Sequence, residues 1–114
     1  MNALSKNIPD HIQNSINDFV HEVNRVFGDK IEKIYLHGVY ISGNFNKISE
    51  INLIIVIDVE NRDEYKKIVD GIYDIDYNLE EKYDFNWYFD IDFCIWDNMD
   101  NEESVVLYEK NNWH

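Results

Sequence analysis

The sequence predicts a single α/β or α+β domain, residues 1–114, in which a small mixed β-sheet is flanked by helices. Three observations predict this fold class. The chain has 114 residues, which is enough for one two-layer core and too few for two. Its content of 45% hydrophobic residues is ample for burial. Stretches with helical spacing of apolar residues alternate with short apolar runs typical of strands.

The first predicted helix covers residues 9–27. Pro9 suits a first helical turn, and Gly28 suits the position past the last one. The apolar residues recur at three- and four-residue steps, as one buried helix face requires: Ile12, Ile16, Phe19, Val20, Val23, Val26 and Phe27. A short strand then runs to His37, and Gly38 stops it.

The run "INLIIVIDV", residues 51–59, is nearly continuous in β-branched and aliphatic residues. Such a run predicts a central strand that is covered on both faces. Asn61 and Glu64 then form a plausible capping box for a second helix, which the apolar period extends to about Lys82. Gly71 falls inside this helix, where we expect it to be exposed and to cost a little helix propensity.

The segment "FNWYFDIDFCIW" alternates and predicts a third strand. Its period of two places Asp90 and Asp92 together on one face, with Tyr88 and Trp96, and the intervening apolar residues on the other. The aromatic residues on the acidic face suggest a partner surface or a pocket floor. The tail from Asp100, with Glu103 as a second capping box, predicts a short closing helix.

The chain is strongly acidic, with 23 Asp and Glu residues against 10 Lys and Arg residues and a net charge of −13. Such a field repels nucleic acid and anionic membranes, and it favours cationic ligands or a basic protein partner. Much of the charge also fits a plain solvated surface. We therefore expect a protein partner and no direct binding of nucleic acid or membranes, and we leave self-association open.

The single cysteine, Cys94, has no second cysteine with which to pair, so a reducing compartment is expected. No stretch approaches the roughly 20 apolar residues that a membrane span needs, and the N-terminus lacks the pattern of a signal peptide. These features predict a soluble, cytoplasmic protein. The histidines lack the spacing and companion cysteines of a zinc site.

The stretch "HGVYISGNFNKISEIN", residues 37–52, joins the first two predicted strands. Gly38 and Gly43 alone are a weak signal for a phosphate-binding loop, because such pairs also serve tight turns. Glu50 and Asn52 strengthen the signal, since their spacing puts both on one face where a buried strand begins. His37 either lines the loop or is a strand-end residue with a satisfied ring nitrogen, and both interpretations stay open.

This stretch resembles the DNA polymerase beta-like nucleotidyltransferases, in particular their small minimal group. The family pattern is a strand ending in Gly-Ser, three residues, a second Gly, and then Ser-Asp-x-Asp-Leu leading into an apolar strand. The matching positions in this chain are Gly38, Tyr40, Gly43, Ser49, Ile51 and Leu53. The order of predicted elements also agrees, so the resemblance covers nearly the whole chain and implies a nucleotidyltransferase-like fold.

The departures from the pattern fall where the family performs its chemistry. Val39 replaces the serine that contacts the nucleotide phosphate, and Glu50 and Asn52 replace the two aspartates that hold metal ions. The resemblance implies a third carboxylate on the later strand, for which Asp90 and Asp92 are both candidates and for which ordinary surface acids are the alternative. Glu50 with either aspartate would hold a divalent ion weakly at best.

The resemblance therefore implies two functions. The first is a catalytically degenerate, nucleotidyltransferase-like pseudoenzyme that acts by protein binding, for example as the antitoxin of a helical HEPN-type toxin, with no cofactor. The alternative is an active, Mg²⁺-dependent enzyme that transfers a nucleotidyl group from a nucleoside triphosphate to a protein or a small hydroxyl compound.

Overall fold

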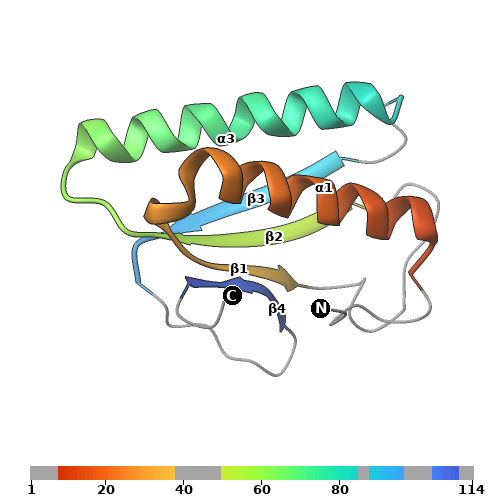
Figure 1. Ribbon diagram of the computed structural model, residues 1–114, viewed down its shortest axis with the longest axis horizontal. Helices are drawn as coiled ribbons and strands as arrows, with labels where there is room; N and C mark the ends of the chain where they lie inside the picture. Colours follow the sequence, from red (N-terminus) through yellow and green to blue (C-terminus); the bar gives the residue numbers. More distant parts are fainter. Residues whose placement is uncertain (1–7, 38–49, 85–87, 97–103, 111–114) are drawn as a thin grey trace.

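The computed structural model describes residues 8–37, 50–84, 88–96 and 104–110 (Figure 1). These residues form an α+β domain with a four-stranded mixed sheet of order β3-β2-β1-β4 and two α-helices. Figure 1 shows α1 and α3 running alongside each other, with β3 and β4 at opposite edges of the sheet. The predicted fold class is therefore confirmed.

Helix α1 spans Asp10–Phe27, and Pro9 is its N-cap residue. Its buried face follows the predicted apolar period, except that Val26 is exposed: the buried residues are Ile12, Ser15, Ile16, Phe19, Val20 and Val23. Gly28 does not end the helix in a left-handed conformation. Its φ of −47° and ψ of −43° are right-handed, and the chain continues into the short 3₁₀ helix η1, Gly28–Lys30.

Strand β1, Ile31–His37, pairs antiparallel with β2, Glu50–Ile57. Strand β2 is central, as its apolar sequence predicts, because β1 and β3 flank it. The predicted cover on both faces is found on one face only among the described residues, because α1 and α3 pack on the same face and Asn52 and Ile54 on the other are half-buried. Its helix-facing residues lie in the core, and Val56, which points to the other side, is also buried. We call the side of the sheet that points away from α1 and α3 the far face.

Helix α3 spans Arg62–Lys82 and is capped as the sequence predicts. The Asn61 side chain accepts a hydrogen bond from the Glu64 backbone N–H at 2.9 Å. Glu64 reaches back to accept from the backbone N–H of Glu60, one residue before the position expected for a capping box. The helix then leads into β3, Tyr88–Cys94, which pairs parallel with β2.

The predicted closing helix is wrong over the described residues, because Ser104–Glu109 forms strand β4, antiparallel to β1. Val105 and Val106 are β-branched, so they favour extended structure, and β1 offers a full row of backbone groups for pairing. The proposed cap residues Asp100 and Glu103 lie outside the described residues. A register shift in the β1–β4 ladder, between Ile34 and Tyr35 of β1, accompanies the burial of both Leu107 and Tyr108.

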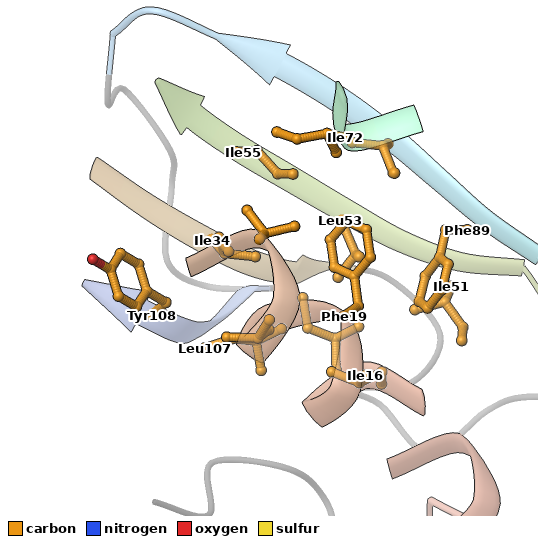
Figure 2. Packing of buried hydrophobic residues seen from close by; sticks show 14 of the residues in the cluster. Ile16, Phe19, Ile34, Ile51, Leu53, Ile55, Ile72, Phe89, Leu107 and Tyr108 are labelled. Atoms are coloured by element: carbon orange, nitrogen blue, oxygen red, sulfur yellow. The ribbon is translucent and has the colours of Figure 1, made fainter. Parts of the chain in front are cut away.

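The core lies between the sheet and the two helices, and Figure 2 shows side chains from both helices and all four strands gathered there. Phe19 of α1 packs against Phe89 of β3, with ring centroids 4.9 Å apart. Ile72 of α3 and Leu53 of β2 are fully buried. This two-layer core fixes which side chains of each strand are left for the far face.

Gly71 is half-buried and is not the exposed helix position that the sequence predicts. A Cβ atom there would lie within 2.9 Å of Cε2 of Phe27 and closer still to Cζ. Glycine therefore allows the end of α1 to approach α3 closely.

No helix in the described part of the chain has the length and hydropathy that a membrane crossing requires.

Candidate functional site

Four polar side chains lie in one register row across the far face of the sheet. His37 of β1 is opposite Ser104 of β4 on one side and Asn52 of β2 on the other, and Asn52 is opposite Asp90 of β3. Their sequence neighbours point into the core, so these four point to the far face. We call Ser104, His37, Asn52 and Asp90 the polar row.

Within the polar row, Nδ1 of His37 and Oγ of Ser104 are 3.1 Å apart in a hydrogen bond. The tautomer of the ring decides which of the two atoms donates. The bond favours the interpretation of His37 as a strand-end residue with a satisfied ring nitrogen. Asn52 is half-buried, and Asp90 is exposed at the sheet edge.

The neighbouring row on the far face is mostly apolar. Asp92 is opposite Ile54 of β2, which in turn is opposite Tyr35 of β1. The parallel register therefore brings Asp90 beside Asn52, and it does not bring Asp92 there. The two acids share one exposed face of the strand, as the alternation predicts.

The other predicted site residues lie at or beyond the limits of the description. Glu50 is the first residue of β2 and is opposite Tyr88, with its side chain outside the described part. Gly38, Val39 and Gly43 lie outside the described residues. Among the predicted site residues, the structure therefore describes the side chains of Asn52, Asp90 and Asp92.

The described residues of the polar row offer a divalent ion one carboxylate, from Asp90, and one neutral amide oxygen, from Asn52. Among the described side chains, no group of three or more His, Cys, Asp or Glu residues is close enough to hold a metal ion. Magnesium prefers several anionic oxygens in octahedral geometry. The described donor set does not fit the pair of Mg²⁺ ions that nucleotidyl transfer requires.

A cavity of about 400 Å³ lies elsewhere, where β2 and β3 end and α3 begins. Its lining combines apolar groups with the cap of α3: Val59, Glu60, Asn61, Arg62, Tyr65, Phe93, Cys94 and Ile95. The capping hydrogen bonds already occupy the Asn61 side chain and the backbone N–H of Glu64. A second cavity of about 350 Å³ lies between α1 and α3. Sequence reasoning identified neither, and neither includes a residue of the polar row.

Sequence reasoning also missed a pair of carboxyl groups beside the edge of β3, one buried and one half-buried. Asp76 of α3 is only 8% exposed, and its Oδ1 has no hydrogen-bond partner among the described groups. Burial, a hydrogen bond with Glu80 and the charge of Glu80 raise the pKa of Asp76 to about 8. Glu80 in turn accepts a hydrogen bond at 3.0 Å from the backbone N–H of Phe89. The sequence could have indicated the burial of Asp76, because position 76 lies one helical turn after the buried Ile72.

No model of a known protein family matches the chain, and no curated protein matches it significantly.

Proposed function

We propose that this chain is a nucleotidyltransferase-like pseudoenzyme that acts by binding a basic protein partner. The observation that carries the proposal is the pairing of Asn52 with Asp90 across β2 and β3. In the resembled family, a carboxylate at the Asn52 position and one on the later strand hold metal ions together. Here the first of these two positions bears an amide.

The amide matters because nucleotidyl transfer relies on divalent ions to neutralise the charge that develops on the phosphates. Replacing Asp by Asn at position 52 removes a full negative charge beside Asp90, and Val39 removes a phosphate-binding hydroxyl. The net charge of −13 also repels a triphosphate. The missing carboxylate, the missing hydroxyl and this repulsion together support a role without nucleotidyl transfer.

The charge of the far face supports a basic partner. Asp90 and Asp92 are exposed on β3, and Tyr88 beside them is 48% exposed. Exposed acids next to an aromatic side chain complement Arg and Lys by ion pairing and by cation–π contact. The setting that the sequence resemblance implies is an antitoxin whose partner is a helical, RNA-cutting toxin of the HEPN type.

The proposal is tested by two measurements on the whole chain. The purified protein should transfer no label from radioactive ATP in the presence of Mg²⁺ or Mn²⁺, whether to itself or to co-purified protein. In a pull-down from the native host, it should retain a basic, helical protein. Robust labelling would overturn the proposal.

The second candidate is an active transferase, and it is favoured by the position of Asp90. Asp90 is exposed on β3 and lies opposite Asn52 of β2, and Glu50 is two residues before Asn52 at the start of β2. If Glu50 and Asp90 hold a metal ion, ATP with Mg²⁺ should raise the melting temperature, and Glu50→Ala should abolish both the shift and the labelling. The absence of any shift at millimolar concentrations argues against this candidate.

A further inference from the structure

Strand β3 forms one edge of the sheet, and its outer backbone groups face away from β2. The Phe89 N–H identifies this direction, because it donates to Glu80 of α3 and not to β2. Since backbone groups alternate along a strand, the N–H and C=O groups of Ile91 and Phe93 point the same way. In the described sheet, β2 is the only neighbour of β3, so these groups have no strand with which to pair there. We call this outer side of residues 89–93 the β3 edge.

The side chains beside the β3 edge differ between its two faces. On the far face, Asp90 and Asp92 are exposed. On the helix side, Phe93 is half-buried and meets Tyr73 of α3 edge-on, with ring centroids 5.6 Å apart. Tyr73 is 47% exposed. A strand added here would therefore have acidic neighbours on one face and aromatic neighbours on the other.

We propose that the β3 edge binds an extended segment of a partner protein in which Arg or Lys alternates with apolar residues. The basic side chains of the segment lie beside Asp90 and Asp92, and its apolar side chains lie beside Phe93 and Tyr73. Its backbone pairs with Ile91 and Phe93 and extends the sheet to five strands. The inference rests on the proposed role in binding a basic protein, and it names the surface and the form of the bound segment.

A second copy of this chain is a poor occupant of the same edge. If two β3 strands paired with each other, Asp90 and Asp92 of one copy would lie beside the same acids of the other. Two molecules of net charge −13 also repel each other at longer range. Asp90 and Asp92 therefore oppose pairing with an acidic strand and favour pairing with a basic one.

Glu80 sets one end of the binding edge. Its carboxylate already accepts from the Phe89 N–H, so an added strand has to pair beyond this residue, along Ile91 and Phe93. The amides of Asp90 and Asp92 face β2 and lie in the existing ladder. Hydrogen exchange can therefore distinguish the two sets of amides on the same strand.

The test uses the whole chain and a synthetic peptide in which arginine alternates with valine. At saturation with peptide, the amides of Ile91 and Phe93 should exchange at least roughly tenfold more slowly, and those of Asp90 and Asp92 should change little. The double variant Asp90→Asn, Asp92→Asn should raise the Kd about tenfold or more. The control double variant Asp58→Asn, Asp74→Asn removes the same charge from exposed positions elsewhere and should leave the Kd within about threefold.

Three outcomes would overturn the inference: no binding, binding that leaves Ile91 and Phe93 unprotected, or equal loss of binding in the two double variants. A peptide in which glutamate alternates with valine should not bind. Failure of the proposed function is separate, because it is decided by nucleotide labelling and by the pull-down. A native partner that is retained equally by the Asp90→Asn, Asp92→Asn variant would leave the proposed function standing and remove the β3 edge as its site.

Discussion

Gly71 of α3 lies directly against the ring of Phe27 at the end of α1, so closely that a Cβ atom would come within 2.9 Å of Cε2. This contact makes a glycine in the middle of a helix favourable, although glycine lowers helix propensity by about 1 kcal/mol relative to alanine. The close approach of the two helices thus outweighs the local preference of the chain.

We expect Gly71→Ala to destabilise the protein by about 1 kcal/mol, because overpacking costs about 1–3 kcal/mol and exceeds the gain in propensity. Urea denaturation measures the change. The Phe27→Leu background provides the control, since without the ring the same Gly71→Ala change should be neutral or stabilising. A more stable Gly71→Ala protein with Phe27 intact would contradict the assigned contact.

The pKa of Asp76, raised to about 8 from its ordinary value of 3.8, predicts a pH dependence of stability. Between these two values the folded protein holds a proton that the unfolded chain has lost. The contribution of Asp76 to stability is therefore greatest below pH 3.8 and falls as the pH rises to about 8, by at most about 1.4 kcal/mol per pH unit. Above pH 8 its contribution no longer changes.

Asp76→Asn should remove this dependence, because the amide can still hydrogen-bond with Glu80 and has no proton to lose. We expect the variant to be more stable than the original protein by at least about 1 kcal/mol at pH 8 and to have a flatter stability profile from pH 5 to 8. Asp74→Asn, at an exposed position on the same helix, is the control. Identical profiles for the Asp76 variant and the original protein would show that Asp76 is ionised when folded.

Tyr83 links the end of α3 to α1, because its Oη donates to Oδ2 of Asp18 at 2.7 Å. The Lys82 ammonium reaches the same oxygen at 3.3 Å but is largely exposed. Tyr83→Phe should cost about 1 kcal/mol of stability, since it removes a hydrogen bond to a charged acceptor. Lys82→Met should cost less than about 0.5 kcal/mol, because exposed ion pairs contribute little. Thermal denaturation at matched ionic strength compares the stability lost in the two variants. A larger loss in Lys82→Met than in Tyr83→Phe would contradict the role given to the Tyr83 hydrogen bond.

The proposed loss of metal binding at Asn52 can be tested by restoring the acid. Asn52→Asp places two carboxylates side by side on β2 and β3, so without metal it should destabilise the protein by about 0.2–1 kcal/mol. Millimolar Mn²⁺ should then raise the melting temperature of the variant and leave that of the original protein unchanged. Asn78→Asp, at an exposed position on α3, controls for added charge. An equal shift in the original protein would support the active-enzyme alternative.

The elements with strong local signals could be predicted from the sequence. The apolar period located α1 and α3, and the pairing of Asn61 with Glu64 located the start of α3. The alternation in β3 placed Asp90 and Asp92 on one exposed face. Each of these features depends on residues that lie close together in the chain, so the pattern itself contains the information.

The remaining features depend on partners that are distant in the chain. The segment that forms β4 follows a plausible capping box, so its local pattern also fits a helix, and pairing with β1, together with the β-branched Val105 and Val106, makes it a strand. The choice of Asp90 as the neighbour of Asn52 depends on the register between β2 and β3. Gly71 appears exposed until the ring of Phe27, 44 positions earlier, is placed against it.

The pairing of β4 with β1 has a consequence for the order of folding. In the described sheet, strand β1 receives its second neighbour from residues 104–109, about 70 positions later in the chain. During synthesis, β1 therefore lacks this neighbour until residues 104–109 have left the ribosome, and loop closure over that distance is slow. A nascent chain that pauses before Ser104 presents β1 as a temporary edge, and an unpaired edge of this kind favours aggregation.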